Sequence, residues 1–99
     1  MGPWTETEVK ALLVEYINLL RNELQGVTLS KTAANARVVK QTGRKKAAVE
    51  FKFANVSAVL KDLGFPYVEG YKPRSNYQAS MKPLVRDAAS AAGIKRLDH

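Results

Sequence analysis

Residues 46–63 read KAAVEFKFANVSAVLKDL, and this stretch decides the fold. At about 100° per residue, its bulkier apolar side chains share one side of a helix: Val49, Phe53, Val56, Leu60 and Leu63. A second apolar set lies nearly opposite: Ala47, Phe51, Ala54 and Ala58. The stop signals Gly64 and Pro66 follow directly. The pattern predicts a helix from about Lys46 to Leu63 that is packed on both sides.

Two further helices are predicted ahead of this stretch. Thr5 and Glu8 have the spacing of a capping box, which starts a helix that Gly26 ends. Its apolar positions repeat with helical spacing: Val9, Leu12, Leu13, Tyr16, Ile17, Leu20 and Leu24. Ser30 caps a second helix that ends at Gly43. A thin apolar stripe is expected on that helix: Leu29, Ala33, Ala36 and Val39.

The chain after Gly64 predicts a loop and one more helix. Residues 64–76 are interrupted by proline and glycine, which favours a loop, or a short β-hairpin (a wing) at 65–75. A last helix is predicted from about Ser80 to Ala92, with Gly93 as its stop. The fold class is therefore mainly α, with about four helices built around a helix-turn-helix. We expect one domain over residues 1–99, with an ordered core from about residue 4 to residue 93.

Positive charge is concentrated in the middle of the chain. The 99 residues carry a formal net charge of +7, and cysteine is absent. Residues 1–30 sum to −2, residues 31–61 to +7 and residues 62–99 to +2. Between Glu23 and Glu50 there is no acidic residue, so the charge of this segment is not cancelled locally. The pattern indicates a polyanionic partner, although a lysine-rich face kept for solubility would look similar.

The residue types that most enzymes need are scarce. The only histidine is His99, the absence of cysteine excludes thiolate ligands, and the carboxylates have spacings that helix solvation explains. We therefore expect no catalytic residue, no metal and no cofactor. The longest uninterrupted apolar run is Ala11–Val14, far too short to cross a bilayer. The expectation is a cytoplasmic protein that does not act at a membrane, of unspecified oligomeric state.

A helix-turn-helix with a basic entrance is the remaining signal. The helix over 30–42, the turn from Thr42 to Lys45 and the helix from Lys46 have the spacing of that motif. Cations at a helix start oppose the helix dipole, so an anionic partner explains them better than local stability does. We predict that five cations neutralise phosphates of double-stranded DNA: Lys31, Arg37, Arg44, Lys45 and Lys46. With about six phosphates engaged, log K falls with log salt at a slope near −5.

Base contacts are predicted on one strip of the central helix. Lys45, Lys52 and Asn55 share a strip without any acid, so Lys52 and Asn55 are candidates for reading base edges. Asn55 is equally compatible with an ordinary polar residue on a half-exposed helix side. The loop after Gly70 adds basic and polar residues that suit a wing on a neighbouring phosphate or groove: Lys72, Arg74 and Asn76. The tyrosines of this loop also fit a structural role.

Two alternatives remain open from the residues alone. The face formed by Phe51, Ala54 and Ala58 could dock a partner or a second copy, which would make this a protein-interaction module. A modified base could be read by an aromatic cage, for which four residues are available: Tyr67, Tyr71, Tyr77 and Phe51.

Several strings also resemble a known family over roughly residues 3–80. They are Pro3-Trp4-Thr5 with Glu8-Val9, Gly43-Arg44, Val49 to Leu60, Leu63 to Tyr67, and Gly70 to Gln78. Together they resemble the N-terminal module found ahead of McrA-like HNH nucleases of the modification-dependent restriction type, and ahead of NO VEIN-type domains, in bacterial multidomain proteins. The resemblance implies a largely helical, DNA-associated accessory module of a defence enzyme. The nuclease would lie in another domain of the parent protein, because the HNH motif has no counterpart in this chain.

Overall fold

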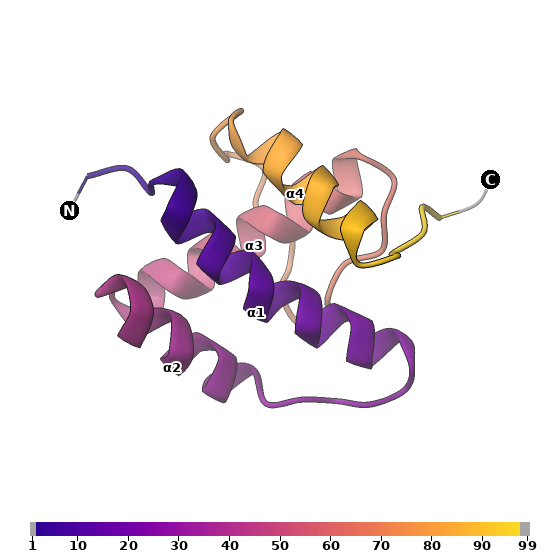
Figure 1. Cartoon of the computed structure of the whole chain (residues 1–99), viewed down its shortest axis with the longest axis horizontal. Coiled ribbons are helices and arrows are strands. Elements are labelled where there is room, and N and C mark those ends of the chain that lie inside the picture. Colours follow the sequence, from indigo (N-terminus) through magenta and orange to yellow (C-terminus); the bar gives the residue numbers. More distant parts are fainter. Residues whose placement is uncertain (1, 98–99) are drawn as a thin grey trace.

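The computed structural model describes residues 2–97, which form a bundle of four helices: α1 (Glu6–Leu24), α2 (Lys31–Thr42), α3 (Lys46–Asp62) and α4 (Met81–Ala91). In Figure 1, α1 crosses in front of α3, α2 lies below this pair and α4 lies above it. Helix α2 contacts α1 and α3, and α4 contacts the same two helices from the other side. The mainly helical fold predicted from the sequence is confirmed. His99, the only histidine, lies outside the described residues.

The predicted caps set the helix boundaries. Thr5 accepts a hydrogen bond from the Glu8 amide, and the Glu8 carboxylate accepts one from the Thr5 amide. Ser30 caps α2 through the Ala33 amide. Gly43 ends α2 in the left-handed conformation, at φ 73°, which a residue with a side chain rarely adopts. The turn between α2 and α3 is therefore fixed by glycine, and Arg44 follows directly.

Helix α3 is buried on two sides, as its sequence predicts. Val49, Phe53, Val56 and Leu60 are fully buried, and Ala54 and Ala58 are buried on the other side. Phe51 lies at the edge, with 38% of its surface exposed. The aromatic core brings three parts of the chain together, because the rings of Tyr16 and Tyr71 lie 6.1 and 4.9 Å from that of Phe53. Most of α3 is consequently withdrawn from solvent.

Only part of the apolar stripe predicted for α2 is confirmed: Leu29 and Val39 pack, partly buried, against the core. Ala34 and Val38 are the apolar residues that are buried, whereas Ala36 is exposed. Asn35 also faces inward, where its Nδ2 donates to the Lys46 carbonyl at 3.2 Å. This bond joins the middle of α2 to the start of α3, and it favours the rotation of α2 that is observed.

The segment between α3 and α4 is a loop that lies against α3. The β-hairpin predicted at 65–75 as the alternative to a loop does not form, and residues 2–97 contain no strand. Its backbone bonds to other elements instead: the Arg74 amide donates to the Ala54 carbonyl at 3.1 Å, and the Val68 amide to the Tyr16 hydroxyl at 2.9 Å. Tyr16 Oη also shares a 2.7 Å hydrogen bond with Ser57 Oγ on α3. These contacts hold residues 65–78 (the α3–α4 loop) along one side of α3.

Candidate nucleic-acid interface

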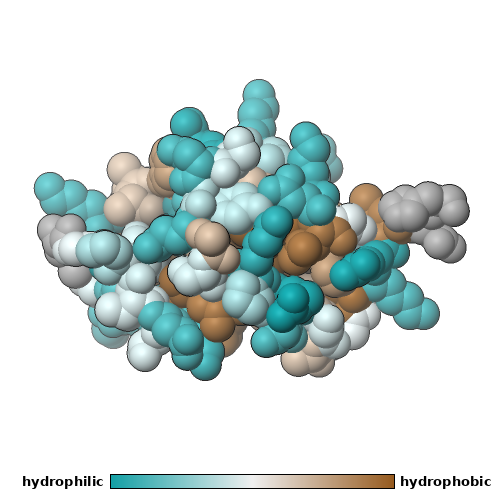
Figure 2. Space-filling view, turned by 90° about the horizontal axis from the view of Figure 1, so that it is seen from above, coloured by the Kyte–Doolittle hydropathy of each residue, from teal (hydrophilic) through white to brown (hydrophobic). Residues whose placement is uncertain are grey.

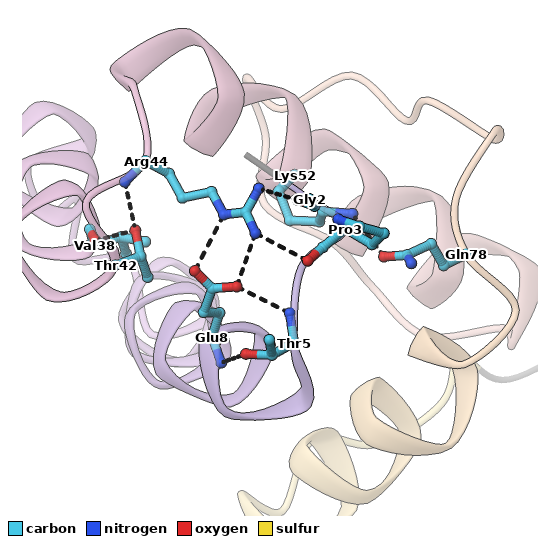
Figure 3. A network of polar contacts seen from close by, with 9 residues as sticks. All are labelled: Gly2, Pro3, Thr5, Glu8, Val38, Thr42, Arg44, Lys52 and Gln78. Carbon is cyan, nitrogen blue, oxygen red and sulfur yellow. Dashed lines mark hydrogen bonds and ion pairs between the residues drawn. The ribbon is translucent and has the colours of Figure 1, made fainter.

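Arg44, a predicted DNA contact, is buried in the structure and does not face the solvent. Its side chain is only 8% exposed and is held by the N-terminal segment (Figure 3). The guanidinium donates to both carboxylate oxygens of Glu8 at 2.9 and 3.1 Å, and to the carbonyls of Gly2 and Pro3 at 2.8 and 3.0 Å. It also lies 4.8 Å from the centre of the Trp4 ring. Arg44 is thus not exposed as the predicted phosphate contact requires, and four of its five N–H donors are used inside the protein.

The contact with Arg44 also lowers the pKa of Glu8. Its hydrogen bonds with the Arg44 guanidinium, followed by that from the Thr5 amide, lower the pKa of Glu8 from 4.5 to about 2. Glu8 therefore caps α1 and also neutralises a cation that follows α2. The N-terminal segment, α1 and the α2–α3 turn are joined by this one carboxylate (Figure 3).

Lys52 and Asn55 are also interior residues, so these two side chains do not face outward as the base-reading prediction requires, whereas Lys45 of the same strip is exposed. Lys52 is 7% exposed, and its Nζ lies 5.6 Å from the Trp4 ring and 3.4 Å from Oε1 of Gln78. Burial, and then the charge of Arg44, lower the pKa of Lys52. Asn55 is 1% exposed, and its Nδ2 donates to the Arg74 carbonyl at 2.7 Å. The α3–α4 loop and the N-terminal segment cover these two side chains.

The other predicted residues of α2 differ in their availability. Arg37 is exposed, but its Nε donates to Glu15 on α1 at 2.9 Å, so its charge is partly matched. Lys31, at the start of α2, reaches the α3–α4 loop: a Cβ built on Gly70 would lie 3.1 Å from its Cε and 3.7 Å from its Nζ. Lys31 thus belongs with the cations of the loop.

A surface pocket of about 390 Å³ lies between α3 and the α3–α4 loop, and we call it the α3–loop pocket. Its lining comes from two segments: Ala47, Glu50, Phe51 and Ala54 on α3, and Gly70, Tyr71, Lys72 and Arg74 on the loop. The Arg74 guanidinium lies 5.1 Å from the centre of the Phe51 ring. The pocket is therefore part aromatic and part charged.

Lys72 and Arg74 line this pocket, Lys31 lies beside its residue Gly70, and Lys45 and Lys46 directly precede its residue Ala47 in the chain. We call these five cations the basic rim. Lys45 and Lys46 are exposed at the start of α3, where Lys45 occupies the N-cap position without a side-chain cap. Among residues 2–97, none of the five forms an ion pair with a carboxylate. Three elements thus contribute unmatched positive charge to one region of the surface.

Of the remaining residues of the predicted wing, one is exposed and one is hydrogen-bonded within the fold. Asn76 is exposed but does not line the α3–loop pocket. Tyr77 donates to Oδ2 of Asp62 at 2.6 Å, which raises the pKa of Tyr77 to about 12. Of the four candidate cage aromatics, only Phe51 and Tyr71 line the same pocket.

The apolar face on α3 that the sequence offers for docking a partner is largely buried. Ala54 and Ala58 are buried, so the face with Phe51 is not a free surface. A larger groove of about 780 Å³ instead runs between α1 and α4. Leu13, Ile17 and Leu84 are among its lining residues, and Val14 stands 69% exposed at its side. From the α4 side, hydrophilic side chains predominate and hydrophobic ones form separate patches (Figure 2).

Glu50 is the pocket residue that sequence reasoning missed as a functional candidate. It is exposed on α3 and is the single acid between Glu23 and Asp62. That isolation within a basic segment was the available signal. The sequence does not show that Glu50 belongs to a pocket, because only the fold brings it beside Tyr71 and Arg74.

Neither a metal-binding cluster nor a membrane-spanning helix is found in the described residues. Within residues 2–97, no cluster of three or more histidine, cysteine or acidic side chains is arranged to hold a metal ion. No helix of the described part is both long and apolar enough to cross a bilayer. Comparisons with protein-family models, curated proteins and solved structures find no match.

Proposed function

We propose that this chain is a non-catalytic module that binds double-stranded DNA through the basic rim. The observation that carries the proposal is the set of five cations without an ion pair among the described residues, at the starts of α2 and α3 and on the α3–α4 loop, two of which line the α3–loop pocket. Lys45 and Lys46 oppose the dipole of the helix that they begin, and the first turn of α3 has no acid. A phosphate backbone would supply the missing negative charge.

The proposed docking differs from that of a freely exposed recognition helix. Helix α3 is buried from Lys52 to Leu60, so only its first two turns could approach DNA. The start of α3 and the loop residues Lys72 and Arg74 would flank a phosphate strand from two sides. In this mode phosphate contacts dominate, and affinity depends strongly on salt.

The family resemblance suggests a biological setting for such binding. A module of this kind would position a nuclease domain of a multidomain restriction protein on DNA, and it would respond to modified sites. In this proposal the parent protein supplies catalysis, while this chain supplies affinity and orientation.

Salt-dependent DNA binding tests the proposal. With five rim cations on phosphates, log K should fall with log salt at a slope of about −4.5. The double variant Lys45→Glu/Lys46→Glu should weaken binding and reduce the slope to about −2.7. A matched control, Lys82→Glu/Lys95→Glu, makes the same charge change at exposed positions on and after α4. Equal losses in both double variants would overturn the proposal, because net charge alone would then explain binding.

The groove between α1 and α4 supports a second candidate, a protein-interaction module. Val14 is the most exposed large apolar residue of the described chain, and it borders a groove with an apolar lining. A chain that is dimeric by light scattering, becomes monomeric on Val14→Glu and ignores DNA at low salt would favour this candidate.

A further inference from the structure

The α3–loop pocket has chemistry that phosphate binding does not require. The cations Lys72 and Arg74 are at its loop side, but Glu50 is exposed on the helix side. A carboxylate repels phosphate, so a surface that served only the DNA backbone would be better without it. The pocket therefore suits a ligand that presents more than a phosphate.

The aromatic residues define the shape of that ligand. Tyr71 is fixed against Phe53, with ring centroids 4.9 Å apart, and its ring is mostly buried. Phe51 is 38% exposed, and the guanidinium of Arg74 already lies over its ring. A flat group can occupy that stacking position if the exposed Arg74 side chain turns to a neighbouring phosphate. Ala47 and Ala54 keep the space beside Phe51 open, because their side chains are small.

The polar groups define the edge of the ligand. Glu50 offers carboxylate oxygens, which accept hydrogen bonds from N–H groups. Burial, and then the charge of Glu50, raise the pKa of Tyr71 to about 12, so its hydroxyl stays protonated and is able to donate. The two residues line the same pocket and thus place an acceptor near a donor. An amino group beside a ring nitrogen, as in cytosine or adenine, matches this pair.

We propose that the α3–loop pocket binds one unstacked, amino-bearing nucleobase of the DNA strand held by the basic rim, with its ring on Phe51 and its amino group on Glu50. This inference rests on the proposed DNA binding and names the part of the strand that the same site reads. The base can come from a duplex position without a partner or from a single strand. An unpaired position lowers the cost of extrusion, which is a few kcal/mol for a paired base.

The experiment compares three labelled duplexes of the same length: fully paired, with one unpaired cytosine, and with one unpaired thymine. A single strand with cytosine or thymine at the corresponding position forms a separate arm. The wild type should bind the unpaired cytosine about 5- to 10-fold more tightly than either other duplex, because stacking on Phe51 favours it over the paired duplex and the hydrogen bond from its amino group to Glu50 favours it over thymine. A cytosine preference in the single strand alone would assign the pocket to single strands, and one in both arms would assign it to any unstacked base.

Three variants, one of them a matched control, separate base reading from charge. Glu50→Ala should bind the paired duplex somewhat more tightly, because it removes a negative charge, yet should lose the cytosine preference. Glu69→Ala is the matched control: it removes the charge of another exposed acid, which does not line the pocket. It should retain the cytosine preference. Phe51→Ala should lose the preference while its thermal unfolding stays close to that of the wild type, since Phe51 lies at the edge of the core.

The outcomes distinguish this inference from the proposed function. Equal wild-type affinity for all three duplexes, together with equal affinity for the two single strands and a salt slope near −4.5, would overturn the base pocket and leave DNA binding intact. A cytosine preference that survives in both Glu50→Ala and Phe51→Ala would also overturn it. Failure of the wild type to bind any of these DNAs at low salt would overturn both proposals.

Discussion

Arg44 and Lys45 are adjacent cations in opposite environments, one buried and one exposed, and replacing each with alanine tests the roles that we propose for them. Arg44 is buried and donates four hydrogen bonds, two of them to Glu8. Lys45 is exposed and has no ion pair within residues 2–97. Both substitutions remove one positive charge, so the difference between them reports position rather than charge.

The expected stability loss for Arg44→Ala follows from its partners. Net contributions of hydrogen bonds to charged groups are about 1.5–3 kcal/mol each. The freed carbonyls of Gly2 and Pro3 lie in an exposed segment where water can replace the guanidinium. Most of the loss therefore comes from the Glu8 pair and the packing on Trp4, and we expect about 2–3 kcal/mol in total. For a domain of this size, that corresponds to a decrease in Tm of about 10–20 °C.

Urea and thermal unfolding followed by circular dichroism measure this loss, and DNA titrations below both melting temperatures measure binding. Lys45→Ala should change stability by no more than about 0.5 kcal/mol. Its DNA affinity should fall and its salt slope should become shallower by about 0.9. Folded Arg44→Ala should keep the wild-type slope. The opposite pattern, in which Arg44→Ala is as stable as the wild type but loses DNA affinity, would refute the interior role of Arg44. It would indicate that Arg44 contacts DNA.

Three further substitutions test polar side chains that form hydrogen bonds within the fold. Lys52→Met keeps the apolar stem and removes a buried charge, so it should be at least as stable as the wild type at pH 7 in urea unfolding. Because the pKa of Lys52 is lowered, the wild type gains stability as pH rises toward 10.5, so the difference should shrink there, and a constant difference would contradict the assignment. Glu8→Gln should lack the loss of stability that the wild type shows in acid titrations from about pH 5 to pH 2, since the folded pKa of Glu8 is lowered from 4.5 to about 2. Asn55→Ala leaves the Arg74 carbonyl without its side-chain donor and should cost about 1–3 kcal/mol in chemical denaturation, whereas an unchanged midpoint would show that water replaces the amide.

The helices were predictable because their signals are local. The Thr5–Glu8 capping box, the Ser30 cap and the left-handed Gly43 each act within four residues of the boundary that they set. The two-sided pattern of α3 follows from helical spacing alone, and the structure buries both sides. For α2, the prediction failed in rotation rather than in extent. The spacing of apolar residues does not reveal that Asn35 faces inward, because its partner, the Lys46 carbonyl, lies on another helix.

The burial of the candidate interface residues was predicted less well because it depends on distant parts of the chain. Arg44 is matched by Glu8, which lies 36 positions away, so the absence of acids near Arg44 in sequence was misleading. Helical spacing placed Lys52 and Asn55 on one strip correctly, but it does not tell which segment covers the strip. The cover is an irregular loop held by single hydrogen bonds, such as that from the Arg74 amide to the Ala54 carbonyl. No periodic pattern reports such contacts.

The distribution of charge explains why position matters more than the total of +7. Residues 31–61 contain eight cations, but the structure matches Arg44 with Glu8 and Arg37 with Glu15, and it buries Lys52. The acidic helix α1 is thus a counter-charge for the basic segment as well as a part of the core. Its other two acids are occupied too: Glu6 pairs with Lys10, and Glu23 accepts from the Glu69 amide. Three of the four acids of α1 are thus paired with cations outside the basic rim. The rim therefore keeps its field, and a polyanion is the partner that this arrangement favours.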